Sequence, residues 1–295
     1  MTGSIAAVPP PLPSLASRSS SGRLLRCGRF VLPLDRPLIM GVVNITPDSF
    51  SDGGRFLDPA AAIAHARRLI EEGADLIDLG AESSRPGAAA VVNADEELRR
   101  LLPVLRALRD LPLSVDTLKP EVMRVALAEG AAMINDINAL RAPGALNVVA
   151  AGDAAVCLMH MQGSPGTMQA HPSYADVVAE VKAFLQERID SVCAAGIALE
   201  RVVIDPGFGF GKTLDHNLEL LRHLREFAGL GAPVLVGWSR KSSLGTITGK
   251  PAGERLAASI AAALIAAQNG AAILRVHDVA ATRDALAVLA AVENT

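Results

Sequence analysis

The chain has 295 residues, of which 50% are hydrophobic and 3% aromatic, and its formal net charge is −3 at pH 7. This length allows one large domain or two small ones with an aliphatic core, and no apolar run is long enough to span a bilayer. The near-balanced charge favours neither nucleic acid nor a membrane as partner, and three cysteines without metal-ligand spacing indicate reduced thiols in a cytoplasmic enzyme.

The beginning of the chain differs in composition from the rest. Residues 1–21 are rich in Pro, Ser and Ala and carry no amphipathic pattern, which predicts a disordered extension. Residues 23–37 look like a short β-hairpin placed before the main fold, where it could close the bottom of a barrel. We expect residues 22–295 to form one domain.

From residue 38 onwards, short apolar runs alternate with helical patterns rich in Ala, Leu, Arg and Glu. The expected strands are 38–44, 76–80, 113–117, 133–137, 155–160, 202–206, 234–238 and 273–277. The helical patterns include 59–73, 95–110, 173–196 and 253–270. Near-continuous apolar strands separated by helices are typical of a parallel sheet that is covered on both faces.

Eight strand–helix units at this length predict an α/β fold, the closed (β/α)8 TIM barrel. A doubly wound open sheet is the alternative. It would be expected to carry a G-x-G-x-x-G turn after its first strand, and the sequence after residue 44, NITPDSFSDGG, lacks one.

Polar residues follow the expected strands, at the end of a barrel where catalytic side chains gather. They are Asn44, Asp48, Glu82, Ser84, Arg85, Asp116, Asn135, Asp136, His160, Asp205, Ser239, Arg240, Lys241, Arg275 and His277. Any one of them could be structural, and Asp116, which precedes a helical pattern, would suit a helix N-cap. Polar groups at the ends of so many strands together indicate a ligand site.

The stretch PGFGFGK, residues 206–212, places two phenylalanines between glycines. It is not a nucleotide P-loop, because Gly207 and Gly211 enclose three residues where that motif needs four. Glycine lets a backbone turn sharply and approach a ligand closely. Phe50 and Trp238 also fall in loops after strands, so the pattern favours a flat ligand, although the rings could instead plug the barrel mouth.

The charged groups indicate two kinds of ligand chemistry. Carboxylates and amides match a heterocycle with several N–H donors, because a carboxylate accepts two parallel N–H bonds. The acids and amide in question are Asp116, Asn135 and Asp205. Basic side chains match an anion, unless they form only a solvated rim. These side chains are Arg85, Lys241, Arg275 and His277.

Motifs along the whole chain resemble those of bacterial dihydropteroate synthases. They include MGVVNITPDSFSDGG (40–54), GAESSRPGA (80–88), VIDPGFGFGK (203–212), GWSRKS (237–242) and RVHDV (275–279). The resemblance runs from about Leu24 to the end of the chain. It implies a usually dimeric (β/α)8 barrel that joins 6-hydroxymethyl-7,8-dihydropterin diphosphate to p-aminobenzoate, with loss of pyrophosphate, and that sulfonamides inhibit by mimicking p-aminobenzoate.

The resemblance also implies roles for individual residues. The pterin would be held by Asp116, Asn135, Asp205 and Lys241. Diphosphate would be bound by Asn44, Ser84, Arg85, Arg275 and His277, with Asn44 as protein ligand of Mg²⁺. The p-aminobenzoate pocket would be formed by Phe50, Pro86, Phe210, Lys241 and Ser242. Catalysis would involve Lys241, Arg275, His277 and Asp205, with the diphosphate leaving before the amine attacks.

Two departures and two alternatives accompany this interpretation. Ser84 stands where the family often has threonine, and Trp238 stands where smaller apolar residues are common. A pterin barrel that transfers a methyl group from methyltetrahydrofolate to a corrinoid is one alternative function. A non-catalytic pterin-binding paralogue is the other. The first-loop motif after Asn44 and the terminal RVH favour the synthase over the methyltransferase.

Overall fold

The computed structural model describes residues 22–46, 58–82 and 92–294. The first elements are two antiparallel strands, β1 (Leu24–Cys27) and β2 (Phe30–Pro33), joined by a tight turn. Residues 1–21, for which we predicted a disordered extension, lie outside the described residues. Of the helices in the described ranges, none is both long and apolar enough to cross a membrane.

An eight-stranded parallel sheet forms the centre of the molecule. Its strands are β3 (Leu38–Asn44), β4 (Leu76–Gly80), β5 (Leu113–Asp116), β6 (Met133–Asp136), β7 (Ala155–Met159), β8 (Val202–Asp205), β9 (Leu235–Val236) and β10 (Ile273–Val276). Their order is β8-β7-β6-β5-β4-β3-β10-β9. A parallel bridge between Ile204 and Val234 connects the two outer strands and closes the barrel.

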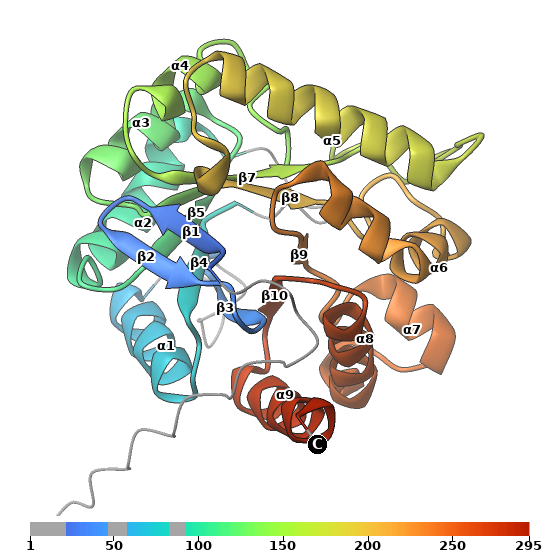
Figure 1. Cartoon of the computed structure of the whole chain (residues 1–295). Coiled ribbons are helices and arrows are strands. Elements are labelled where there is room, and N and C mark those ends of the chain that lie inside the picture. The colour runs from blue at the N-terminus through green and yellow to red at the C-terminus, as the bar shows by residue number, and fades with distance from the viewer. Residues whose placement is uncertain (1–21, 47–57, 83–91, 295) are drawn as a thin grey trace, which may run out of the picture.

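Helices follow the strands and surround them, as Figure 1 shows in a view along the barrel. They are α1 (Pro59–Glu71), α2 (Ala94–Ala107), α3 (Pro120–Ala128), α4 (Ala145–Ala150), α5 (Val177–Ala194), α6 (Leu214–Arg222), α7 (Ser242–Thr248), α8 (Leu256–Gln268) and α9 (Val279–Glu293). Short 3₁₀ turns cover Leu199–Arg201, Leu224–Leu230 and Ala252–Glu254. The first helix starts where its sequence requires, with Asp58 capping the Ala60 N–H and Pro59 in the first turn.

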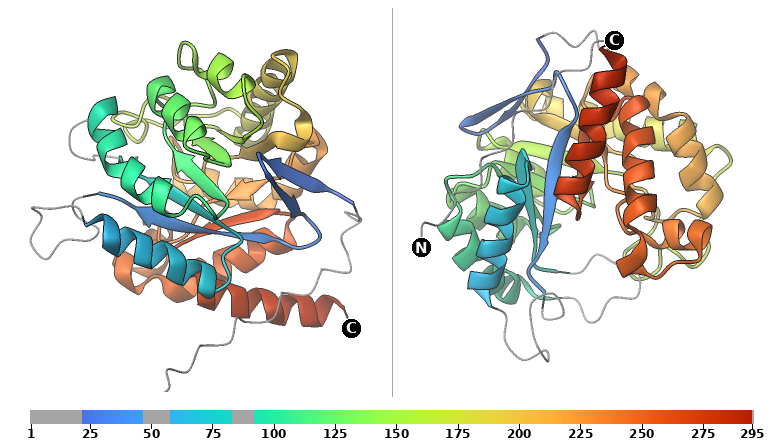
Figure 2. Two further views of the ribbon diagram at one scale, coloured as in Figure 1. Left: turned by 90° about the vertical axis from the view of Figure 1, so that its left-hand side faces the viewer. Right: turned by 90° about the horizontal axis from the view of Figure 1, so that it is seen from below.

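Alternate residues of each strand belong to two different cores. Outward residues such as Ile39 and Ile77 pack against the helices, whereas inward residues such as Met40 and Leu76 pack inside the barrel. The hairpin contributes buried Leu25 to the inner core, at the end where the strands begin (Figures 1 and 2). The hairpin therefore closes the bottom of the barrel.

The predicted α/β barrel with an N-terminal hairpin is confirmed, and the doubly wound alternative is wrong. The seventh barrel strand is shorter than its expected range of 234–238. After Val236 the chain leaves the sheet and turns towards α7, and the Lys241 N–H approaches the Trp238 carbonyl. The other barrel strands lie within one residue of their expected ranges.

Candidate active site

Arg275 forms the centre of a buried network at the carboxyl ends of the strands. Its Nε donates to Asp78 Oδ2 at 2.6 Å, and its Nη2 donates to Asp116 Oδ2 at 3.1 Å. The three side chains come from β10, β4 and β5. Two carboxylates on neighbouring strands thus fix the guanidinium plane inside the barrel.

Asn135 on β6 extends this network. Its Nδ2 donates to Asp78 Oδ2 at 3.2 Å. An ionised carboxylate can only accept hydrogen bonds, so the amide nitrogen must face Asp78. The Asn135 carbonyl oxygen is therefore directed elsewhere, where it can accept a bond from a ligand.

Asp205 at the end of β8 lies close to the same groups. Its Oδ1 accepts from the Gly207 N–H at 2.7 Å, and a Cβ placed on Gly237 would lie 4.0 Å from its Oδ2. The same Cβ would lie 3.7 Å from Arg275 side-chain atoms. The missing side chain at Gly237 therefore leaves space where Asp205 and Arg275 come together.

Burial dominates the protonation of these acids. It raises the pKa of Asp116 to about 7, since loss of water outweighs the opposing charge of Arg275, while Asp78 adds to the increase. Burial also raises the pKa of Asp205, against the effect of Lys241. A ligand that presents N–H donors would favour the ionised form of both.

Lys241 lies between the acids and the glycine-rich loop. Its Nζ donates to the Phe208 carbonyl at 2.5 Å and stands 4.5 Å from the centre of the Phe210 ring. Burial lowers the pKa of Lys241 to about 8, although nearby Asp205 favours its charged form. The ammonium can therefore contact ligand groups on both the acid side and the aromatic side.

The loop after β8 is held from beneath by Lys212. The buried Nζ donates to the Gly207 and Phe210 carbonyls at 3.0 Å each, and stands 2.9 Å from His160 Nδ1. Burial, and then the charge of Lys212, lower the pKa of His160 to about 2. The neutral imidazole accepts a bond from Lys212 and helps to orient the loop.

Gly207 is required by this packing. Its φ is 73°, and a Cβ there would lie 1.9 Å from the His160 carbonyl oxygen. Only glycine fits so close to another backbone. The loop glycines therefore serve loop packing at least as much as approach to a ligand.

The aromatic residues do not all face a ligand, in contrast to our prediction. Phe208 is fully buried and stacks on Trp238 with ring centres 5.0 Å apart. Trp238 Nε1 donates to Ser243 Oγ at 2.6 Å, and both rings belong to the core between barrel and helices. Phe210 is partly exposed beside Lys241. Trp238, which stands where smaller apolar residues are common in the family, therefore has a packing role in this structure.

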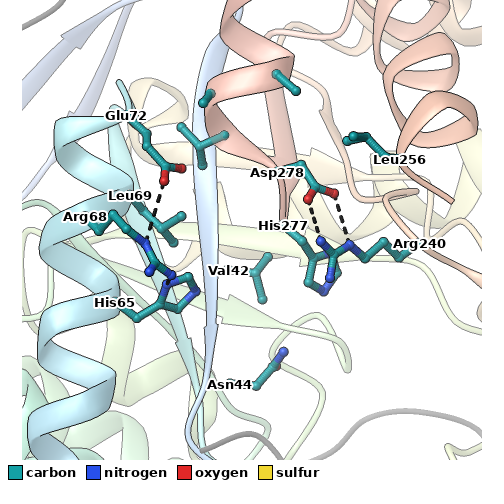
Figure 3. Close-up of a pocket in the computed structure, with 13 residues that line it drawn as sticks. Val42, Asn44, His65, Arg68, Leu69, Glu72, Arg240, Leu256, His277 and Asp278 are labelled. Atoms are coloured by element: carbon teal, nitrogen blue, oxygen red, sulfur yellow. Dashed lines mark hydrogen bonds and ion pairs between the residues drawn. The ribbon is translucent and has the colours of Figure 1, made fainter. Parts of the chain in front are cut away.

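Asn44 and His277 line a cavity of about 680 Å³ between α1 and α9 (Figure 3). The Ser239 hydroxyl lies 3.1 Å from His277 Nδ1 and orients the ring. A Cβ on Gly80 would lie 3.8 Å from both Asn44 Oδ1 and the Asp116 side chain. Asn44 thus lies between the cavity and the buried acids.

The possible metal ligands among the described residues suit a metal ion that binds together with a substrate. They suit a permanently bound metal ion less well. In these parts of the chain, no three His, Cys, Asp or Glu side chains gather as metal ligands. Asn44 offers a neutral amide oxygen at the cavity wall. Mg²⁺ is commonly held by one or two protein oxygens together with substrate phosphates and water, so Asn44 fits such a site.

The remaining predicted residues divide into two groups. Ser242 is the first residue of α7. Phe50, Ser84, Arg85 and Pro86 lie outside the described residues. The helix-cap alternative for Asp116 is wrong, because α3 begins after Lys119 without a side-chain cap and Asp116 bonds to Arg275 instead.

Sequence analysis missed two buried charged residues of this site, Asp78 and Lys212. Asp78 is the one charged residue in the run LIDLG. An acid within an apolar strand needs a buried partner, so this position could have indicated a buried ion pair. Lys212 ends the glycine-rich loop, and sequence analysis assigned it no role. Nothing local in the sequence indicates that its ammonium is surrounded by acceptors from His160, Gly207 and Phe210.

Most of the chain resembles known pterin-binding proteins. Residues 40–277 match the family model described as pterin binding enzyme. The fold and this match define a pterin-binding barrel enzyme. The dihydropteroate synthase of Haemophilus influenzae is 50% identical over 266 residues, which cover 89% of this chain and 96% of that protein.

Solved structures agree with the sequence relatives. Xanthomonas albilineans dihydropteroate synthase with 4-aminobenzoic acid is 56% identical, covers 92% of this chain and 99% of its own, and has a TM-score of 0.86. The enzyme of the same organism in complex with 7,8-dihydropteroate is 51% identical, covers 93% and 100%, and has a TM-score of 0.82. The chain belongs to the dihydropteroate synthase family.

Proposed function

We propose that this protein condenses 6-hydroxymethyl-7,8-dihydropterin diphosphate with p-aminobenzoate, giving 7,8-dihydropteroate and pyrophosphate. The observation that carries the proposal is the network in which Arg275 joins Asp78 and Asp116 inside the barrel. A relative solved with 4-aminobenzoic acid and one solved with 7,8-dihydropteroate support the same pair of substrates. Residues 22–295 form the pterin-binding domain in this proposal.

The pterin occupies the barrel interior. Its N–H donors bond to Asp116 and Asp205, Asn135 Oδ1 accepts a further bond, and Lys241 donates to a ring acceptor. The support for this placement is that Asn135 Nδ2 already faces Asp78, and that the acids are buried beside Arg275. Buried carboxylates recognise a guanidine-like edge strongly, because both bonds are charge-assisted.

The diphosphate lies towards the cavity that Asn44 and His277 line. Arg275 approaches it from the acid side, and Ser84 and Arg85 from the second loop complete the set. Mg²⁺, when bound with the diphosphate, would be held by Asn44 and would offset the negative charge of the leaving group. Asn44 keeps this end of the substrate beside the Asp116 cluster.

The p-aminobenzoate lies on the other side of Lys241. Phe210 provides a flat apolar wall beneath the Lys241 ammonium, and Ser242 at the start of α7 binds the carboxylate. Phe50 and Pro86 are further residues that we assign to this pocket. The amine is thereby held next to the exocyclic carbon of the pterin.

The reaction proceeds by departure of diphosphate before attack of the amine. The bond from the pterin methylene carbon to oxygen breaks, and its electron pair leaves with the diphosphate. The electron-rich ring and the surrounding carboxylates stabilise the positive charge, while Arg275 and His277 stabilise the leaving group. The amine nitrogen then forms the new bond to carbon and loses one proton.

The decisive experiment measures pyrophosphate release from the pterin diphosphate with Mg²⁺ and p-aminobenzoate. We expect turnover that requires all three and that a sulfonamide inhibits in competition with p-aminobenzoate. A methyltransferase-type barrel and a non-catalytic paralogue would both bind pterin and release no pyrophosphate. Pterin binding without pyrophosphate release would therefore reject the proposal.

We also propose that the protein acts as a cytoplasmic homodimer. The neighbouring helices α8 and α9 expose aliphatic side chains, with Ile265 at 45%, Val288 at 66% and Val292 at 69% exposure. Such side chains on adjacent helices suit a self-complementary contact. Light scattering of the parent and of a Val288→Asp variant tests the dimer, which should dissociate in the variant.

The proposed cytoplasmic location is supported by the cysteines. Cys27, Cys157 and Cys193 are free thiols, which suits a reducing compartment.

A further inference from the structure

Asp78 has an unusual position within the barrel. It is the middle residue of β4 and is fully buried. Its partners belong to β10 and β6, which lie two strands away on either side in the order β6-β5-β4-β3-β10. A side chain can reach both only by pointing into the barrel, so Asp78 lies in its interior.

Asp78 determines the orientation of two ligand-facing groups. Without Asp78, the Arg275 guanidinium would keep its hydrogen bond to Asp116 and could rotate about that bond. The bond from Nε to Asp78, at 2.6 Å, removes this freedom. The bond from Asn135 at 3.2 Å fixes which end of that amide faces the ligand.

Stability alone does not explain an acid at this position. A buried ion pair is often no better for stability than well-packed apolar residues of similar size. Asp78 Oδ1 is buried with no hydrogen-bond partner among the described residues, and so is the Oγ of Ser114, its register partner on β5. An unsatisfied oxygen adds to the cost of keeping the carboxylate here.

We propose that Asp78 is a positioning residue for the reaction, which orients Arg275 and Asn135 without touching the substrates. This inference rests on the proposed function. Arg275 then presents its remaining donors in a constant direction, and Asn135 always offers its oxygen to the pterin. Removal of Asp78 should impair the pterin side of the site and leave the p-aminobenzoate side unchanged.

The first test is Asp78→Asn, which keeps the shape and removes the charge. We expect kcat/KM for the pterin diphosphate to fall at least about tenfold, since a buried charged partner is lost, and KM for p-aminobenzoate to change less than about twofold. Ser114→Ala, which alters the same interior layer, is the matched control and should match the parent. Parental kinetics in Asp78→Asn, or equal losses for both substrates, would overturn the proposal.

The second test repeats Asp78→Asn in an Arg275→Met background. With the arginine removed, Asp78 is a buried acid without its cation, so its replacement should raise the melting temperature there and cause no further loss of kcat. In the parent, the same replacement should lower kcat. Equal effects in both backgrounds would show that Asp78 does not act through Arg275.

Asp78→Asn could fail to fold, or the parent could lack activity, and each case has its own readout. If Asp78→Asn alone does not fold, the double variant should fold, and calorimetry with the pterin should still give weaker binding than Arg275→Met alone because Asn135 is no longer oriented. An unchanged affinity would contradict the role. If the parent releases no pyrophosphate, the proposed function fails. The melting temperatures of Asp78→Asn in the parent and in the Arg275→Met background still test the coupling of Asp78 to Arg275.

Discussion

At the scale of single residues, burial makes two acids of the barrel interior, Asp116 and Asp205, harder to ionise before a ligand arrives. Burial raises the pKa of Asp116 to about 7 and also raises that of Asp205. A heterocycle with N–H donors stabilises the charged carboxylates and so lowers these pKa values on binding. Binding near neutral pH is therefore coupled to the release of protons.

We predict that pterin affinity decreases as the pH falls below about 7, the pKa of Asp116 in the free protein. The ionised form binds, so affinity is complete above this pKa and is lost below it, approaching about tenfold per pH unit. Calorimetry from pH 5.5 to 8.5, in two buffers with different ionisation enthalpies, gives both the affinity and the number of protons released.

Asp116→Asn is the control for the pH prediction, because Lys212 also has a pKa of about 7, lowered by burial. The variant should bind weakly, and the pH dependence of binding near pH 7 should be reduced. An unchanged pH profile in this variant would assign the titration to another group.

We also predict that Asp205→Ala weakens pterin binding by at least about 100-fold, since two charge-assisted hydrogen bonds to the ring are lost. Titration calorimetry with the pterin measures the effect. Asp215→Ala, which removes an exposed acid in the first turn of α6, should leave affinity unchanged. Near-parental affinity in Asp205→Ala would refute its role at the ring edge.

At the scale of elements, the loop between β8 and α6 is held by side chains from several parts of the chain. Lys212 binds its carbonyls from within, the Tyr174 hydroxyl donates to the Gly211 carbonyl, and Asn217 Oδ1 accepts from the Gly209 N–H. These bonds hold a glycine-rich backbone in one conformation. The position of Phe210 beside Lys241 therefore depends on groups that touch no ligand.

We predict that Lys212→Met raises KM for p-aminobenzoate by roughly tenfold, because unsatisfied loop carbonyls displace Phe210. Pterin affinity should change less, since Asp116 and Asn135 lie on other strands. Steady-state kinetics with each substrate varied in turn measures the difference. Lys250→Met, at an exposed lysine after α7, is the control. Equal effects on both substrates would indicate general loosening.

At the scale of the whole molecule, the barrel separates stability from chemistry. The hairpin packs Leu25, Cys27 and Leu34 into the end where the strands begin, and the buried acids lie at the other end. The bottom can therefore be weakened without reorganising the site. Changes there should alter the free energy of unfolding and leave the kinetics unchanged.

We predict that Leu25→Ala lowers the free energy of unfolding by about 2–5 kcal/mol, because a fully buried side chain leaves a cavity. Urea denaturation measures the loss, and kcat at 25 °C should match the parent. Leu24→Ala changes its 42% exposed neighbour and should alter stability by no more than about 0.5 kcal/mol. A large loss of kcat in Leu25→Ala would show that the two ends are coupled.

Several parts of the site were accessible to sequence analysis because their signals are local. Asp116 and Asp205 end apolar strands, Asn135 is the next-to-last residue of another, and in a parallel barrel the strand ends lie together. The helix starts and strand ranges follow from caps and apolar periodicity, as Asp58 and Pro59 show for α1. The motif resemblance then assigned roles that no local pattern could supply.

Other features required the folded chain. Phe208 and Phe210 are two residues apart in the same glycine-rich loop, yet one stacks on Trp238 in the core and the other is partly exposed beside Lys241. Lys212 is buried beneath the loop, where its Nζ reaches His160, 52 residues earlier in the chain. Sequence composition around these residues does not distinguish the two outcomes.

The sequence by itself determined the alternating strands and helices, the barrel and the strand-end acids, because these depend on periodicity and on residues near one another in the chain. Only the tertiary structure decided that Asp78 joins Arg275, 197 residues later, and that Phe208 belongs to the core. The physical reason is that burial and pairing depend on which strands become neighbours when the barrel closes. That arrangement turns an acid in an apolar strand into the partner of a cation.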